Sequence, residues 1–178
     1  MPRNVEIKAV VRDRALFLEK VRELTHSLGT EASQEDTFFK CPNGRLKLRC
    51  VNGDVNNGLL IHYERGDVSA PKLSDFSKTE VTDAAKLKET LTKALGLVGV
   101  VRKRRHLFMC DRTRVHLDDV DSLGTFMELE VQLEPHESAE DGETVATELM
   151  GKLAVSEECL ISGAYMDLLL RKKKNEST

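Results

Sequence analysis

Strict alternation of apolar and charged residues, repeated along several short segments, is the feature that most constrains how this chain can fold. In NVEIKAVV (residues 4–11) every second residue is apolar, and Glu6 and Lys8 occupy two of the positions between. The same period recurs in RLKLRCV (residues 45–51) and FMELEV (residues 126–131). Successive side chains of a β-strand point to opposite faces, so this period predicts strands with one apolar and one charged face.

Helices are expected between these strands. Asp13 is suited to cap a helix, and apolar residues with helical spacing follow it until Gly29. Helical periodicity returns over residues 83–96, 142–153 and 159–172. Strands are expected within residues 4–11, 35–51 with a Pro-Asn-Gly turn, 59–66, 100–110, 113–119 and 125–134, and residues 67–77 are expected to form a polar surface loop.

Size and charge narrow the class of protein. The 178 residues suffice for one domain, and we place it at residues 1–172, followed by a disordered tail at 173–178. A net charge of −3 does not favour nucleic acid as a partner. The N-terminus lacks the apolar stretch of a signal peptide, and no apolar run is long enough for a membrane span. We therefore expect a cytoplasmic protein without a membrane partner. The four scattered cysteines are expected to be reduced thiols, which agrees with that location.

The charges are segregated by strand, which leaves two interpretations of the sheet. An open antiparallel sheet would expose its charged face to water. Like charges at every second position repel, however, and 32% charged residues exceeds the ~25% of ordinary domains. Alternatively, the strands close into a barrel whose charged faces line a wet lumen, while helices cover the apolar outside. Such a lumen would bring carboxylates and cations together, as a metal-bound polyphosphate requires.

Four blocks of the sequence resemble the CYTH family, also called triphosphate tunnel metalloenzymes. NVEIKAV is similar to its E-x-E-x-K signature, and QEDTFFKCPNGRLKLR is similar to its block of an aspartate-containing strand and a basic strand. RVHLDDVDSLGTFMELEV resembles the block I-H-L-D-x-V-x-x-L-G-x-F-x-E-x-E, and SGAYMDLLL resembles the bacterial ending S-Y-x-D-L-L. The blocks follow the family order and span nearly the whole chain.

The resemblance implies an α+β fold, a closed eight-stranded antiparallel barrel with a charged interior and helices packed outside. It implies Mg²⁺ or Mn²⁺ as cofactor. It also implies catalytic and metal-binding roles for four acidic residues, Glu6, Glu128, Glu130 and Asp118. The residues implied to bind the triphosphate are Lys8, Lys47, Arg49, Arg65, Lys103, Arg105 and Arg114.

The sequence departs from the family pattern in three respects. The first glutamate of the E-x-E-x-K signature is Asn4 here, which replaces a carboxylate by a neutral oxygen donor. The vertebrate thiamine-triphosphatase branch has a tryptophan near the substrate, and this chain has none. That branch also has a lysine four residues before the C-terminal tyrosine, where this chain has Ile161. These departures argue against a site specialised for thiamine triphosphate.

Three functions are compatible with the sequence. The first is metal-dependent hydrolysis of inorganic triphosphate or a small organic or nucleoside triphosphate. The second is an adenylyl cyclase that converts ATP into cyclic AMP and pyrophosphate. The third is a non-catalytic module that binds polyphosphate or nucleotide. In each case we expect a small-molecule ligand and a monomer or homodimer.

Overall fold

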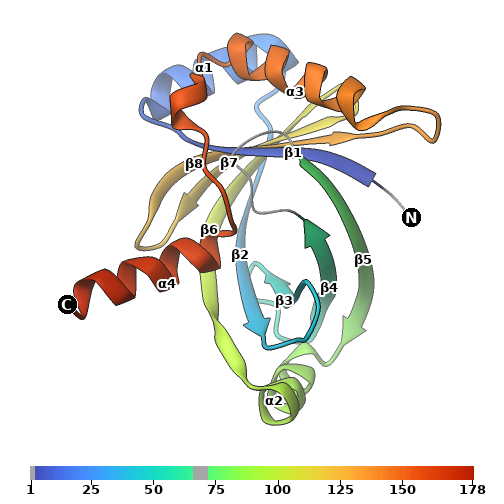
Figure 1. Ribbon diagram of the computed structural model, residues 1–178, viewed down its shortest axis with the longest axis vertical. Coiled ribbons are helices and arrows are strands. Elements are labelled where there is room, and N and C mark those ends of the chain that lie inside the picture. Colours follow the sequence, from blue (N-terminus) through green and yellow to red (C-terminus); the bar gives the residue numbers. More distant parts are fainter. Residues whose placement is uncertain (1–2, 66–71) are drawn as a thin grey trace.

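The computed structural model describes residues 3–65 and 72–178, and its centre is a closed antiparallel barrel (Figure 1). The hydrogen-bonded order of its eight strands is β1-β5-β4-β3-β2-β6-β7-β8, and β8 closes on β1. The strands are β1 (Arg3–Val10), β2 (Thr30–Phe39), β3 (Arg45–Val51), β4 (Asn57–Arg65), β5 (Lys72–Thr82), β6 (Leu97–Cys110), β7 (Thr113–Val120) and β8 (Gly124–Gln132). The fold expected from the sequence is confirmed.

In the described part of the chain, four α-helices and one short 3₁₀ turn lie outside the barrel (Figure 1). Helix α1 and helix α3 cover one side, α2 lies at one end of the barrel, and α4 begins beside β6 and extends away from it (Figure 1). Their bounds are α1 (Arg14–Thr25), α2 (Ala84–Leu95), α3 (Ala139–Lys152), the turn η1 (Glu157–Cys159) and α4 (Tyr165–Glu176).

The apolar faces of β1 and β8 point outward, toward α1 and α3. Ile7 of β1 and Leu129 of β8 are buried in a cluster with Phe17 of α1 and Leu149 of α3. This burial supplies the main driving force for closing α1 and α3 over the barrel. Because strand residues alternate, an apolar outside leaves the charged faces of the same strands pointing into the lumen.

Local signals identify the helices, although some bounds differ from those expected. The Asp13 side chain accepts a hydrogen bond from the Leu16 backbone N–H, as a helix N-cap does. The helix ends at His26, which adopts a left-handed conformation (φ 50°), rather than at Gly29. Helix α3 begins at 139, where Ser138 and Asp141 form a capping box, three residues before the expected start.

Two further expectations differ from the structure. Residues 72–77 were expected in a loop but belong to β5; the rest of that loop, 67–71, lies outside the described residues. Helix α4 starts at Tyr165 rather than at 159 and continues to Glu176, so residues 173–176 form an exposed helical turn instead of an irregular tail. No helix within residues 3–65 and 72–178 has the length and apolar character needed to cross a membrane.

Candidate functional site

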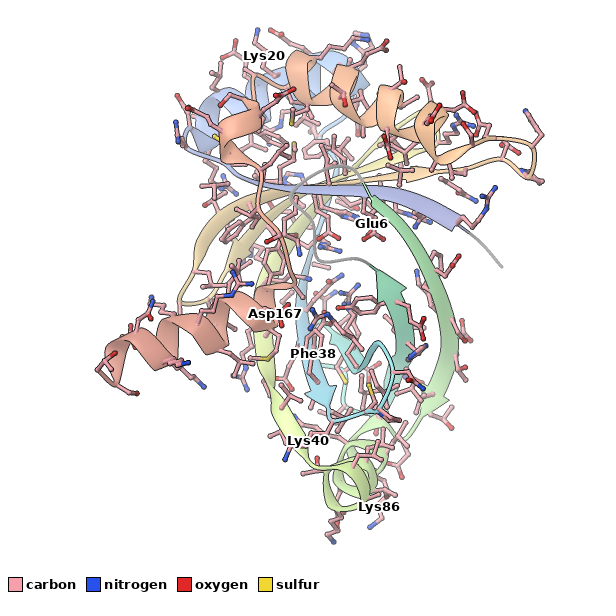
Figure 2. The ribbon with its side chains drawn as sticks, in the orientation of Figure 1. Glu6, Lys20, Phe38, Lys40, Lys86 and Asp167 are labelled. Atoms are coloured by element: carbon pink, nitrogen blue, oxygen red, sulfur yellow. The ribbon has the colours of Figure 1, made fainter. Side chains whose placement is uncertain are left out.

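A cavity of ≈ 680 Å³, which includes open solvent, occupies the lumen of the barrel. Figure 2 shows Glu6 and Phe38 turned toward the barrel interior, whereas Lys20 and Lys86 point away from it. Seven strands and the start of α4 contribute to the wall. The lining residues are Asn4, Glu6, Lys8, Asp36, Phe38, Lys47, Arg49, Ile61, Tyr63, Phe76, Lys78, Val101, Lys103, Arg105, Glu128, Glu130, Ala164 and Tyr165.

Carboxylates gather on the neighbouring strands β1 and β8. The register places Glu6 directly opposite Glu130, and it places Lys8 opposite Glu128. Directly opposite residues have Cβ atoms about 5 Å apart, so Glu6 and Glu130 form a close pair of like charges on the cavity wall. Such a pair is unfavourable unless a cation compensates it.

Cations gather on the opposite wall. Strand β3 lies four places from β8 in the eight-stranded ring, so its charged face looks across the lumen toward the carboxylates. Asp36 of β2 holds this basic group together. Its oxygens accept hydrogen bonds from Arg49 Nε and Nη2, both at 2.7 Å, and from Lys47 Nζ at 3.0 Å. Lys103 Nζ of β6 lies 3.7 Å from the same carboxylate.

The pKa values of this group follow from burial and charge. Burial alone would raise the pKa of Asp36, but the charges of Arg49, Lys47 and Lys103 outweigh it and hold that pKa well below its usual value. Burial, followed by the charge of Arg49, lowers the pKa of Lys47 to about 8. Burial and the nearby charge of Arg105 also move the pKa of Lys103 well below its ordinary value. Two lysines of the wall therefore give up their protons more easily than exposed lysines do.

A second acidic anchor lies beneath the lining. Asp118 of β7 is 0% exposed and accepts two hydrogen bonds of 2.7 Å from Arg105 Nε and Nη2. Its Oδ2 atom also accepts a bond of 2.7 Å from the Tyr165 hydroxyl. Burial opposes ionisation of Asp118, but Arg105 outweighs it and lowers the pKa to about 2. Arg105 Nη2 further donates to Glu128 Oε2 at 3.1 Å, so this arginine links the buried aspartate to the acidic wall.

Most of the site residues expected from the sequence meet in this lumen. Eight of them line the cavity: Glu6, Glu128, Glu130, Lys8, Lys47, Arg49, Lys103 and Arg105. Asp118 lies under the lining and contacts it through Arg105. Arg114 Nη1 lies 3.8 Å from Glu130 Oε2 with 41% of its side chain exposed. The backbone of Arg65 ends β4, and its side chain is outside the described part of the structure.

Among the lining residues that the sequence did not identify are two charged residues, Asp36 and Lys78, and the buried Tyr165. Asp36 belongs to the QEDTFFKCPNGRLKLR block, but the sequence does not identify it as the centre of the basic group. Lys78 was not predicted to line the site, because its strand begins with polar residues after Pro71 and was not recognised as a strand in full. Tyr165 belongs to the SGAYMDLLL block but was not assigned to the site; it is buried, and it also lines the cavity. The S-Y-x-D-L-L resemblance was the available signal for Tyr165.

The carboxylate group has the chemistry of a divalent-cation site. Glu6, Glu128 and Glu130 offer oxygen ligands on one wall, and hard cations such as Mg²⁺ and Mn²⁺ prefer oxygen. Within residues 3–65 and 72–178, no three His, Cys, Asp or Glu side chains converge closely enough to hold a metal ion by themselves. Mg²⁺ commonly takes one or two protein carboxylates and completes its shell with phosphate oxygens and water. The residues therefore fit a metal that binds together with a phosphate ligand.

Comparisons with known proteins agree with this architecture. A Methanocaldococcus jannaschii protein, named provisionally as an adenylate cyclase, is 25% identical over 177 residues, covering 93% of this chain and 97% of its own. A conserved hypothetical protein of Pyrococcus furiosus has a similar structure, with a TM-score of 0.81, 22% identity and coverage of 93% and 99%.

A third similar structure is that of a Hippeastrum protein, also named provisionally as an adenylyl cyclase and described as having a dominant triphosphatase activity. Its TM-score is 0.63 at 14% identity, over 96% of both chains. At these identities the structural likenesses establish the fold alone. The family match is more direct, because the CYTH domain pattern covers residues 2–165, which include the whole barrel and the first residue of α4. The chain belongs to the CYTH domain family.

Proposed function

We propose that this protein is a metal-dependent hydrolase of triphosphates, acting on inorganic triphosphate or a small organic triphosphate inside the barrel. The observation that carries the proposal is the division of one cavity into an acidic wall and a basic wall. Among the described residues, the lining has six cations (Lys8, Lys47, Arg49, Lys78, Lys103 and Arg105) and four carboxylates (Glu6, Asp36, Glu128 and Glu130).

The basic wall is suited to hold the phosphate chain. Arg49 and Arg105 are each fixed by two hydrogen bonds to an aspartate, and their remaining N–H groups can donate to phosphate oxygens. Lys47 and Lys103 add point charges that adapt to the position of the chain. Cations held in place before the substrate arrives need little reorganisation as charge develops on the leaving diphosphate.

The acidic wall is suited to the reacting end of the chain. Glu6, Glu128 and Glu130 would hold Mg²⁺ or Mn²⁺. When bound, the divalent cation supplies neutralisation of the phosphate charge and a lower pKa for a bound water. The carboxylate oxygens of Glu128 and Glu130 would orient the attacking water in line with the terminal phosphorus and accept its proton.

An adenylyl cyclase is the second candidate, because the M. jannaschii relative carries that provisional name. The same cations would bind the phosphates of ATP, and the ribose 3′-hydroxyl would replace water as the nucleophile at the α-phosphorus. A non-catalytic module is the third candidate, and Asn4 on the cavity wall is the residue that favours it, since one expected carboxylate is missing there.

Product analysis separates the three functions. The protein is incubated with inorganic triphosphate, ATP and other organic triphosphates, with Mg²⁺ or Mn²⁺ and with EDTA. Phosphate, pyrophosphate and cyclic AMP are then quantified. Metal-dependent release of phosphate that stops in EDTA supports hydrolysis, and cyclic AMP with pyrophosphate would favour the cyclase. Full activity in EDTA would contradict the metal role, and binding without turnover would leave only the non-catalytic module.

A further inference from the structure

Every lysine found on the described part of the cavity wall lies against an aromatic ring. The arginines of the same wall, Arg49 and Arg105, each form two hydrogen bonds to a buried aspartate, and of the four lysines Lys47 also donates to Asp36, at 3.0 Å. The distances from lysine Nζ to ring centroid are 3.9 Å for Lys8 and Tyr165, 5.1 Å for Lys103 and Tyr165, 5.5 Å for Lys47 and Phe38, 5.4 Å for Lys47 and Tyr63, and 4.8 Å for Lys78 and Phe76.

Rings suit lysines that must keep their charge available for a ligand. An ammonium over a ring face is attracted by the π-electrons, and the attraction is stronger where water is excluded. A carboxylate would attract the ammonium more strongly, but it would also neutralise the charge that a phosphate needs. An aromatic ring therefore positions a buried lysine without supplying a competing anion.

Tyr165 occupies a special place in this arrangement. Its single ring contacts Lys8 from β1 and Lys103 from β6, two strands that are not neighbours in the barrel. Lys8 Nζ also lies 3.9 Å from Glu128 Oε2, and Lys103 Nζ lies 3.7 Å from Asp36 Oδ2, both longer than ordinary hydrogen bonds. The ring thus contacts two cations on separate strands of the cavity wall.

The hydroxyl group of Tyr165 reaches a third cation indirectly. It donates to Asp118 Oδ2, and Asp118 accepts both hydrogen bonds that orient Arg105. Burial and the charge of Asp118 raise the pKa of Tyr165 well above its usual value, so the phenol keeps its proton and remains a donor. The Tyr165 side chain, at the start of α4, therefore contacts charged residues of three strands: Lys8 of β1, Lys103 of β6 and Asp118 of β7.

We propose that Tyr165 is a positioning residue of the phosphate site: its ring holds Lys8 and Lys103 in place, and its hydroxyl supports the Asp118–Arg105 pair. The inference rests on the proposed function, because the cations are taken to bind phosphate. It also assigns α4 a role, since docking of this helix completes the site inside the barrel.

The alternative is that Tyr165 only fills the core. Its ring also packs against Phe126, at 5.1 Å between centroids, so its removal will destabilise the fold whatever its other roles. Phe126 is equally buried, at 5% exposed against 4% for Tyr165, but it does not belong to the described cavity lining. Phe126→Leu is therefore a matched control that removes a ring from the same cluster and leaves the site intact.

The test measures binding of inorganic triphosphate in EDTA by calorimetry, where turnover is not expected, together with the melting temperature of each variant. Tyr165→Leu removes the ring, Tyr165→Phe keeps it, and Phe126→Leu is the control. We expect Tyr165→Leu to weaken binding about tenfold or more, because both the ring and the hydroxyl are lost. Tyr165→Phe, which loses only the hydroxyl support of Asp118, should weaken binding about threefold. Phe126→Leu should bind like the wild type despite a lower melting temperature.

Each outcome decides the inference. Binding by Tyr165→Leu that equals that of the Phe126→Leu control would overturn it and leave the proposed function standing. Equal losses in Tyr165→Leu and Tyr165→Phe would show that the ring is not the part that holds the lysines, which also overturns it. Failure of the wild-type protein to bind triphosphate, with or without metal, would instead contradict the proposed function and the inference with it.

Discussion

Asp36 shows how one buried residue organises the basic wall. It is 1% exposed and contacts three cations from two strands, Lys47 and Arg49 of β3 and Lys103 of β6. Removing one partner of such a group is costly, because the others remain buried without compensation. Without Asp36, three positive charges would face each other across the junction of β3, β2 and β6.

We therefore expect Asp36→Asn to lower the free energy of unfolding by about 3 kcal/mol at pH 7. The folded-state pKa of Asp36 lies below its unfolded value, so this contribution is fully present above an unfolded pKa of about 3.9. It is lost as the pH falls through the folded-state pKa. Urea unfolding of both proteins from pH 7 to pH 3 should show the difference shrinking below about pH 4.

Glu35 is the matched control for this measurement. It precedes Asp36 on β2 and faces the other side of the strand, where it contacts Lys88 and Arg102 near the surface. Glu35→Gln removes the same charge, yet it should cost less than about 1 kcal/mol because these pairs are partly solvated. If the two variants lose equal stability at pH 7, Asp36 is not the anchor of the wall.

Lys47 leads to a prediction about protons. Because its pKa is lowered to about 8, this lysine is only partly charged at pH 8, and a bound polyanion should restore its charge. Triphosphate binding at pH 8 should therefore take up protons, which calorimetry in buffers of different ionisation enthalpy measures. Lys47→Arg keeps a permanent charge and should reduce the uptake by about half a proton. Identical uptake in the two proteins would contradict this role of Lys47.

At the scale of elements, strand β8 carries the acidic face. Glu128→Gln with Glu130→Gln should reduce turnover of triphosphate at least about 100-fold, because both the metal ligands and the groups that orient water are removed. Stability should fall modestly, since Arg105 Nη2 donates to Glu128 and the cavity already has more cations than carboxylates. Phosphate release with Mg²⁺ at 25 °C, after circular dichroism has verified folding, gives the measurement.

Two exposed glutamates provide a control of equal charge. Glu19 on α1 and Glu148 on α3 lie on the outer helices, and the double change to glutamine alters the net charge by the same amount. Its turnover should match that of the wild type. A Glu128/Glu130 double variant with wild-type turnover would show that β8 bears an ordinary solvated face rather than the reacting wall.

Strands with clear alternation could be predicted from sequence, and β5 could not. From Met127 to Gln132 of β8 apolar and polar residues alternate strictly, so Glu128 and Glu130 could be assigned to one face from the sequence. Strand β5 (Lys72–Thr82) follows Pro71 and begins with polar residues, and these signals favour a loop. The strand forms because it pairs with β1 on one side and with β4 on the other, and both strands would otherwise have an unpaired edge. This pairing is a tertiary effect that the local sequence does not reveal. Lys78 was missed with its strand.

The individual charges of the site were predictable, but their partners were not. Alternation placed Arg49, and the family resemblance placed Arg105, among the site residues, whereas the residues that fix them come from other strands, Asp36 and Asp118. Which aspartate meets which arginine depends on register and barrel closure, and both are set by the whole sheet. Asp118 was expected among the metal ligands. In the structure its carboxylate accepts two hydrogen bonds from Arg105 and thereby orients this side chain.

Across the whole molecule, charge is separated between the inside and the outside. The chain has a net charge of −3, yet the described cavity lining has six cations and four carboxylates. The outer surface therefore carries the excess negative charge, and the lumen carries positive charge in a region of low dielectric. Mutual repulsion of the cations should make the ligand-free barrel less stable than its packing alone would allow.

A polyanion that enters the lumen should relieve this repulsion and stabilise the fold. At a triphosphate concentration of 100 times Kd, linkage gives about 2.7 kcal/mol. For a domain of this size, that corresponds to a rise in Tm of about 5–10 °C. Differential scanning calorimetry with increasing inorganic triphosphate in EDTA measures the shift, and sodium chloride at equal ionic strength is the control. The shift should shrink in Arg49→Ala, which loses a cation of the lining, and persist in Arg102→Ala, whose side chain is 59% exposed. An equal shift with chloride, or in both variants, would mean that triphosphate acts through general screening at the surface rather than inside the barrel.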